Sequence, residues 1–343
     1  MKKLLNTLYI LSDDIYLSLE NANIAAWKDG KIVQKIPMIN LENIISFSRS
    51  GASPQLMGAC AEKHIGLCFL TPEGHFLARI NGKSNGNVFL RKEQYRISDD
   101  ENKSARVAAC MIAGKIYNER VVLRRTFRDH PLSIDKKAFD TASDILRQAA
   151  VDALGADSLE TLRGIEGNAA QVYFSLFEQM ILADKKHFFF NGRNKRPPLD
   201  RTNALLSFAY TILAHDCANA LEAVGLDSYV GFLHRDRPGR ISLALDLMEE
   251  LRSPAADRFV LTLINNRIGN AKDFKTMENG AVLLNDDGRK KFLAQWQEKK
   301  KEQIQHPFLK EKIARGLIPY AQAMLLAKFI RNDLDQYPAF LGQ

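Results

Sequence analysis

Two acidic residues stand in a segment whose other side chains are mostly apolar. Residues 241–252 read ISLALDLMEELR, with apolar residues in nearly every direction around a helix, so we expect this helix to be largely buried. Asp246 and Glu249 are spaced i to i+3 and project from one face of it. Two buried carboxylates repel each other unless a cation or hydrogen-bond donors compensate them, and a metal ion would do so. Salt bridges with the flanking arginines, or exposure of this face to solvent, would also explain the pair.

His234 and Glu166 are further candidates for a chemical role. His234 precedes Asp246 in a segment where charged residues surround a Pro-Gly pair, which is typical of a loop that leads into the acidic helix. A lone histidine is more often a surface or hydrogen-bonded residue. Glu166 is expected in the first turn of a helix, where the helix dipole alone would favour a carboxylate. Gly164 and Gly167 flank it, and such small residues let another backbone or a ligand approach closely.

A cluster of cations lies between these candidates. Residues 191–203 carry Arg193, Lys195 and Arg196 beside a Pro-Pro pair, which favours an extended path. Such cations could contact phosphates without reading bases, although a simple charged loop has the same composition. The sequence contains neither a Walker lysine motif nor GxGxxG, so chemistry driven by a nucleotide is not expected.

Composition places the chain among soluble globular proteins. Its 343 residues are 46% hydrophobic and 26% charged, and this length accommodates about two domains. Apolar runs fall short of the roughly 20 residues of a membrane-spanning helix, and the start lacks a signal-peptide cleavage site, so we expect a cytoplasmic protein. The net charge of +8 is compatible with a polyanionic partner or with a solvated basic surface. The four cysteines fit no standard zinc or redox motif and are expected to be reduced core thiols.

The elements that must position these residues differ between the two parts of the chain. Up to residue 85, short alternating apolar stretches separated by turn residues predict a small domain of mainly antiparallel strands. Ser53 can cap one helix there, with Pro54 in its first position. The expected strands cover residues 8–11, 15–19, 24–27, 32–36, 44–47, 67–70 and 76–80.

Helical spacing dominates after a polar break at residues 82–86. The expected helices cover residues 107–121, 165–182, 203–223, 241–251, 253–267, 288–305 and 319–334. The predicted fold class is therefore α+β, with a small N-terminal antiparallel β domain of residues 1–85 and a larger all-α catalytic domain of residues 86–343.

Three motifs carry a resemblance to a known family. The first is GIEG at residues 164–167, and the second is RPP at residues 196–198, leading into NALLSFAY at residues 203–210. The third is His234 followed by SLALDLME at residues 242–249. In this order they resemble the CRISPR-associated spacer integrase, the near-universal adaptation protein of CRISPR systems. The resemblance extends over essentially the whole chain, since that family also has an N-terminal β domain and a C-terminal helical domain.

The resemblance implies a metal-dependent DNA endonuclease and integrase that inserts fragments of invader DNA as new spacers. The family's catalytic and metal-binding residues fall on Glu166, His234 and Glu249, and Asp246 matches a further acid in the same helix. Many members have aspartate where this chain has Glu249, so either acid could be the closer ligand. One imidazole with two or three carboxylates suits Mg²⁺ or Mn²⁺. Such an ion can activate a DNA 3′-hydroxyl for direct transesterification without ATP.

The resemblance also implies partners. These are DNA, as duplex, branched and single-stranded ends, a second copy of the chain in a homodimer formed by the N-terminal domain, and a small ferredoxin-like CRISPR adaptation partner. No membrane is involved. The cations expected to offset phosphate charge are Arg193, Lys195, Arg196, Arg235, Arg237 and Arg240.

Two other functions remain open at this stage. A metal-dependent nuclease that hydrolyses branched or single-stranded DNA in repair could use the same residues. A catalytically inert basic scaffold would use the acids only in salt bridges.

Overall fold

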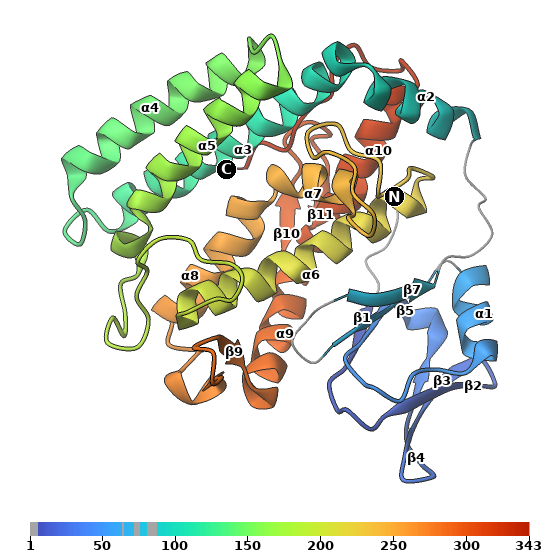
Figure 1. The fold of residues 1–343 in the computed structure, drawn as a ribbon. Coiled ribbons are helices and arrows are strands. Elements are labelled where there is room, and N and C mark those ends of the chain that lie inside the picture. Colours follow the sequence, from blue (N-terminus) through green and yellow to red (C-terminus); the bar gives the residue numbers. More distant parts are fainter. Residues whose placement is uncertain (1–5, 64, 72–75, 81–87, 343) are drawn as a thin grey trace. The chain divides into compact units, whose positions relative to one another are not determined.

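The computed structural model describes residues 6–63, 65–71, 76–80 and 88–342. The chain forms two compact units, and the α+β class is confirmed (Figure 1). The first unit comprises Met1–Asn85, Leu284–Gln303 and Ala314–Leu317, and the second comprises Gly86–Leu283, Ile304–Ile313 and Ile318–Gln343. The expected turn at residues 72–74 and the polar break at residues 82–86 lie outside the described residues.

An antiparallel three-stranded sheet forms one layer of the first unit. Its strands are β2 (Tyr16–Glu20), β3 (Asn23–Lys28) and β4 (Lys31–Pro37), in that order. Two-residue turns at 21–22 and 29–30 join them, and all four turn residues have positive φ. That geometry matches the natural twist of the strands, which is why such short turns produce antiparallel neighbours here.

The other sheet of the first unit is mixed, which corrects the expectation of antiparallel neighbours throughout. Its order is β1 (Asn6–Ile10), β5 (Leu41–Ser46), β6 (Gly66–Leu70) and β7 (Phe76–Ile80). β1 pairs with β5 and β5 with β6 in parallel, whereas β6 and β7 are antiparallel. The physical reason is connection length: β2 to β4 separate β1 from β5, and α1 (Pro54–Glu62) separates β5 from β6, so each connection is long enough for a crossover.

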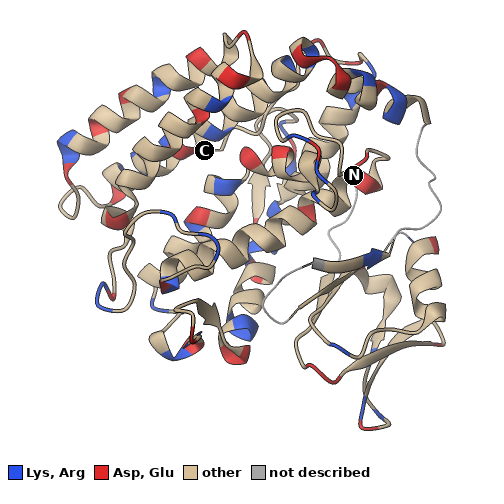
Figure 2. Ribbon diagram, in the orientation of Figure 1, with Lys and Arg blue, Asp and Glu red and all other residues tan. Residues whose placement is uncertain are grey.

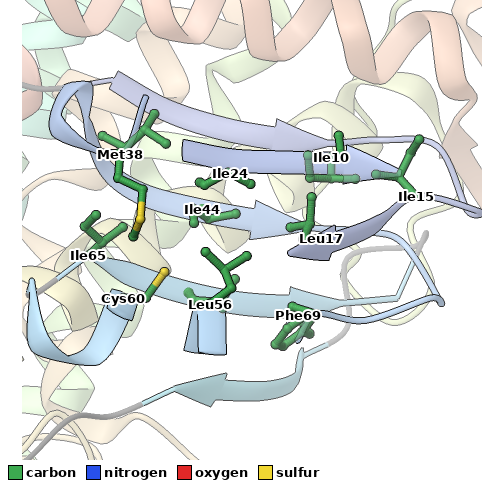
Figure 3. Packing of buried hydrophobic residues seen from close by; sticks show 14 residues of the cluster. Ile10, Ile15, Leu17, Ile24, Met38, Ile44, Leu56, Cys60, Ile65 and Phe69 are labelled. Carbon is green, nitrogen blue, oxygen red and sulfur yellow. The ribbon is translucent and has the colours of Figure 1, made fainter. Parts of the chain in front are cut away.

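The core of the first unit lies between these strands and α1. The predicted cap is confirmed, because the Ser53 side chain accepts a hydrogen bond from the backbone N–H of Leu56 at 3.2 Å. Leu56, Leu17 and Ile44 are completely buried in an apolar cluster (Figure 3). The unit also includes α9 (Asp286–Lys301), where Gln297 donates to the backbone carbonyl of Thr7 at 3.2 Å. The first unit therefore extends beyond residues 1–85.

The second unit is mainly helical. Figure 1 shows α3, α4 and α5 side by side, in agreement with their mutual contacts. Two of its helices, α2 and α4, were not expected from the sequence. Its helices are α2 (Val88–Asp99), α3 (Glu101–Asp129), α4 (Lys136–Leu154), α5 (Leu159–Ser175), α6 (Arg201–Ala223), α7 (Ser242–Glu249), α8 (Arg258–Asn265) and α10 (Ile318–Ile330).

Shorter elements complete the chain. A π-helical turn, Arg252–Asp257, connects α7 to α8. Two short strand pairs, β8 with β9 and β10 with β11, add to the helices, so the region after residue 86 is not strictly all-α. The strands are β8 (Phe274–Thr276), β9 (Val282–Leu284), β10 (Gln303–Gln305) and β11 (Lys312–Ala314). None of the helices in the described part of the chain combines the length and apolarity needed to cross a membrane. The four cysteines are buried and form no disulfide with one another, as predicted.

Candidate active site

Asp246 on α7 organises the loop that carries His234. Its carboxylate is completely buried and accepts hydrogen bonds from the backbone N–H groups of Phe232, Leu233 and His234 at 2.6 to 3.0 Å. The Nδ1 of His234 lies 2.6 Å from Oδ1 of the same carboxylate. Gly231 is required at the start of this loop, because a Cβ there would stand 2.8 Å from Oδ2 of Asp246. Asp246 therefore fixes the orientation of the imidazole.

Glu249, one turn further along α7, faces a different set of groups. Its side chain is only 4% exposed, and its oxygens lie 2.9 Å from Nζ of Lys115 on α3 and 2.8 Å from the guanidinium of Arg252. The salt-bridge alternative raised for this helix is thus realised by Arg252. Lys115 also contacts the carboxylate of Glu166 on α5. One buried ammonium group therefore joins two carboxylates from two different helices.

The position of Glu166 differs from the expected one. Helix α5 begins at Leu159, where the Ser158 side chain accepts from the backbone N–H of Thr161, so Glu166 lies two turns inside the helix. The helix dipole does not explain a carboxylate there, because its effect is confined to the first turn. Arg163, on the same helix, donates to the backbone carbonyl of Leu233 at 2.7 Å and so connects α5 to the loop that carries His234.

A cavity of about 600 Å³ opens beside Lys115 and Glu166. Acidic and basic side chains both line it: Lys115, Glu119, Glu166, Arg193, Lys195 and Arg252. No backbone approaches the flanking glycines, since a Cβ on Gly164 or Gly167 would meet no atom within 4 Å. Gly167 itself lines the cavity. All of these residues belong to the second unit.

Burial and charge act in opposite directions on the ionisable groups here. Burial alone would raise the pKa of Glu249, but the charges of Arg252, Lys115 and His234 lower it to about 2. Burial would lower the pKa of Lys115, yet the neighbouring carboxylates, led by Glu249, raise it above its usual value. For Glu119, burial prevails over the attraction of Lys115 and raises the pKa to about 8. The surroundings therefore favour the charged forms of Glu249 and Lys115 and the protonated form of Glu119.

The predicted basic residues occupy two loops, and the blue ribbon segments of Figure 2 mark basic residues along the one that precedes α6. Arg193 is tied to α6 by hydrogen bonds to Asn203 and Ser207, and its guanidinium lies 5.3 Å from the Tyr210 ring centre. Lys195 lines the cavity, and burial together with the charges of Arg252 and Arg193 lowers its pKa. Over the whole residue Lys195 is nevertheless exposed, as are Arg196, Arg235 and Arg237, and Arg240 is half-buried.

Sequence reasoning missed Lys115 and Glu119. They stand i to i+4 on α3, in a stretch otherwise rich in buried Ala, Ile and Met, so the signal that singled out α7 was present here as well. Within the described residues, no group of three or more His, Cys, Asp or Glu side chains is gathered as a metal cluster. Three ion pairs engage the candidate ligands instead: Lys115 contacts both Glu166 and Glu249, and Asp246 contacts His234.

These features define a class: an α+β protein whose helical unit gathers acidic and basic side chains around one cavity and holds a histidine against a buried acid of α7. The family model described as CRISPR associated protein Cas1 matches residues 8–298, and the chain belongs to the Cas1 family. A protein of Chlorobaculum tepidum named CRISPR-associated endonuclease Cas1 1 is 46% identical over 99% of both chains. A Rhodospirillum rubrum protein named CRISPR-associated endonuclease Cas1 2 is 47% identical over 98% of both. The family resemblance predicted from the motifs is therefore confirmed, and the chain is an enzyme of the Cas1 endonuclease family.

Solved structures share the fold at lower identity. A Cas1 protein from Thermotoga maritima matches with a TM-score of 0.81 and 22% identity, covering 95% of this chain and 97% of that one. A casposase bound to integration product matches with a TM-score of 0.83 and 20% identity over 97% of this chain and 93% of that one. A chain of a Cas6-RT-Cas1–Cas2 complex matches all of this chain with 37% of its own length, at a TM-score of 0.81 and 22% identity.

Proposed function

We propose that this protein is a metal-dependent DNA endonuclease and integrase that inserts invader-derived DNA fragments into a CRISPR array, in the cytoplasm, by transesterification. One observation carries the proposal beyond family membership. Glu166 and Glu249 reach the same buried ammonium from separate helices, beside a cavity whose wall includes Lys195 and Arg252. This arrangement combines a place for a cation with a place for a phosphate.

Glu166, His234 and Glu249 are the residues we propose as holding Mg²⁺ or Mn²⁺. Lys115 supports this assignment, because its ammonium group shows that a positive charge is accepted between the carboxylates of Glu166 and Glu249. Carboxylate oxygens suit hard divalent cations. Asp246 takes Nδ1 of His234 and leaves Nε2 as the nitrogen that can bind an ion, so we assign Asp246 the role of orienting the ligand. When bound, such an ion stabilises the charge that develops on the leaving oxygen of a phosphodiester.

The cations of the cavity wall are proposed to bind the DNA backbone. Lys195 is crowded by Arg252 and Arg193, whose charges help to lower its pKa, so a phosphate would relieve their mutual repulsion. The exposed Arg235 and Arg237 lie in the loop after His234, and we propose that they bind further phosphates. Together with Arg196 and Arg240, these residues would contact phosphates without selecting a sequence.

The proposed partners are DNA, a second copy of the chain and a small ferredoxin-like CRISPR adaptation protein. The fold supports the first and third, because similar chains occur in a casposase bound to integration product and in a Cas1–Cas2 complex. We assign dimer formation to residues 1–85, where Val33 and Ile39 are apolar side chains that are 57% and 82% exposed. We assign catalysis to the region from residue 86 onward.

The nucleophile distinguishes an integrase from a hydrolytic nuclease. An integrase attacks with the 3′-hydroxyl of the incoming DNA, so the protein and its small partner should join a labelled duplex to a repeat-containing target in Mn²⁺ or Mg²⁺. A duplex ending in dideoxynucleotides lacks that hydroxyl, and with it both the joined product and the associated target nick should disappear. Glu249→Gln, which keeps the shape of the side chain but not its charge, is the matched control and should join neither duplex.

Other outcomes would identify the competing functions. Target nicking that persists undiminished with the dideoxy duplex, without joining of the normal one, would show that water is the nucleophile and would support the repair nuclease. Failure of the wild-type protein to bind Mn²⁺ in a direct titration would support the inert scaffold.

A further inference from the structure

Residues near the end of the sequence form hydrogen bonds with Glu250, the residue that follows Glu249. The carboxylate of Glu250 is completely buried and accepts three hydrogen bonds. They come from the hydroxyl of Tyr337 at 2.6 Å, the side-chain amide of Gln322 at 2.8 Å and the backbone N–H of Phe340 at 2.9 Å. Two of these donors belong to the last residues of the chain, so that segment is held directly at the end of α7.

The same segment is bonded to α3. The side-chain amide of Asn118 donates to the backbone carbonyls of Glu250 and Phe340, each at 2.7 Å, and its oxygen accepts from the backbone N–H of Gly342 at 2.6 Å. One buried amide thus connects α3, the end of α7 and the end of the chain. Because every one of these groups is polar and buried, each needs its partner in place.

Helix α3 and the segment around Ala339 are in close contact at Gly114. A Cβ added to Gly114 would stand 2.8 Å from the Cβ of Ala339, which is closer than side chains approach. Positions 114 and 118 of α3 therefore touch the end of the chain, while Lys115 and Glu119, each the next residue along, line the cavity. If residues 337–342 moved, α3 would move with them, and Lys115 and Glu119 would change position in the cavity wall.

We infer that residues 337–342 act as a positioning strap that sets the spacing of α3 and α7, and with it the distance from Lys115 to Glu249. The inference deepens the proposed function and rests on it, because it treats Glu249 as a residue of the active site. Asn118, Glu250 and Tyr337 are positioning residues in this scheme: they touch neither DNA nor metal.

A reciprocal pair of substitutions tests the strap. Gly114→Ala creates the clash with Ala339, and adding Ala339→Gly removes it. Gly114→Ala should weaken Mn²⁺ binding about 10-fold or more, the loss typical when support behind a metal ligand is disturbed, and should lower the joining rate in parallel. The double variant should recover most of both. DNA affinity in the absence of metal should change little, because Arg193, Lys195, Arg196, Arg235 and Arg237 lie on loops that the strap does not contact.

Hydrogen exchange of the metal-free protein supplies a readout that needs no ion. Backbone amides of α7 should exchange faster in Gly114→Ala and return towards the wild-type rate in the double variant. Unchanged exchange would overturn the strap. So would faster exchange with unchanged Mn²⁺ affinity, because the segment would then stabilise the fold without positioning the site. Absence of Mn²⁺ binding in the wild type would overturn the proposed function, while exchange would still show whether the segment holds the two helices.

A milder variant covers the case in which Gly114→Ala does not fold. Tyr337→Phe removes one donor to Glu250 and keeps the ring, so it should weaken Mn²⁺ binding in the same direction by a smaller factor. Tyr95→Phe is the matched control, because it removes a 2.8 Å hydrogen bond from a tyrosine to Asp227 elsewhere in the second unit. Equal Mn²⁺ affinities for these two variants and the wild type would overturn the inference.

Discussion

The interiors of the two compact units differ in kind. The cluster of the first unit consists of apolar side chains and one thiol, among them Leu17, Ile44 and Leu56 (Figure 3). The second unit buries acidic and basic side chains together, among them Lys115, Glu119, Glu249, Glu250 and Asp257, whereas the buried charged side chains among the described residues of the first unit are Arg289 and Lys300 of α9. Removing charges from water costs free energy that pairing only partly offsets, whereas apolar burial is favourable by itself. The comparison indicates that the first interior serves stability and the second serves the site.

Each buried charge among Lys115, Glu249 and Arg252 of the second unit is compensated by a neighbour of opposite charge. Lys115 contacts Glu166 and Glu249, and Arg252 contacts Glu249. Removal of one member leaves another charge buried without compensation, whereas removal of an apolar side chain from the first unit leaves only a cavity. The predictions below test whether this difference holds.

The largest effect should come from the proposed ligands. Glu166→Ala, His234→Ala and Glu249→Ala should each abolish DNA joining, because each removes a donor that no neighbouring side chain replaces. Ile44→Ala in the first unit is the control and should leave joining by the folded protein unchanged. Product formation from labelled DNA in Mn²⁺ measures this, with circular dichroism as the check on folding. Any ligand variant that joins DNA at the wild-type rate would remove that residue from the site.

Lys115→Met should show the cost of an unpaired buried charge. It leaves Glu249 without one of its two cations, and the expected loss is about 3–5 kcal/mol in the free energy of unfolding of the second unit. Adding Glu249→Gln should recover part of that loss. Ile44→Ala should cost about 2–5 kcal/mol in the first unit, through a cavity that no second change of charge can offset.

Two spectroscopic signals separate the units in that experiment. Both tryptophans, Trp27 and Trp296, belong to the first unit, so their fluorescence follows its unfolding in urea. Far-ultraviolet circular dichroism follows mainly the helices of the second unit. Lys115→Met should shift the dichroism transition and Ile44→Ala the fluorescence transition. If either variant shifts both transitions equally, the units unfold together and the comparison of their stabilities fails.

The same contrast explains how much could be predicted from the sequence. The strands and the hairpins of β2 to β4 follow from local alternation and turn residues, and the cap at Ser53 follows from the residues beside it. Parallel pairing of β1 with β5 depends on chain segments far apart and left no local signal. Glu166 was expected in a first turn because the cap at Ser158 was not recognised.

The candidate site divides in a similar way. Residue type and spacing drew attention to Asp246 and Glu249, and the family resemblance assigned roles to Glu166 and His234. The partner of Glu166 could not be predicted, because Lys115 reaches it through the packing of α3 against α5. Charge balance is a property of the tertiary structure, whereas the presence of a charge in an apolar helix is visible in the sequence.

Asp246→Asn should have a smaller effect than loss of a ligand. Asparagine can keep an oxygen for the N–H groups of Phe232 and Leu233, but its amide nitrogen would then face the backbone N–H and Nδ1 of His234, where Oδ1 stands now. Joining should fall by about 10- to 100-fold, and higher Mn²⁺ should recover part of it. Asp227→Asn is the matched control, since Asp227 also accepts from a backbone N–H, that of Tyr229 at 2.9 Å, and neither lines the cavity nor contacts His234. A wild-type rate for Asp246→Asn would contradict the positioning role.

The smallest effect should come from single exposed cations, and it tests whether DNA binding also belongs to the second unit. Each of Arg196→Ala and Arg237→Ala should weaken binding to unrelated duplexes by a similar factor. If each residue neutralises one phosphate, the slope of log affinity against log salt should flatten by about 0.9 per substitution.

Lys35→Ala in the first unit is the control. Lys35 is already paired with Glu20 at 2.6 Å, so this substitution should leave the slope unchanged. Fluorescence anisotropy over a range of salt concentrations measures both quantities. A flatter slope for Lys35→Ala with no change for the two arginine variants would place the phosphate contacts in the first unit and reverse the comparison.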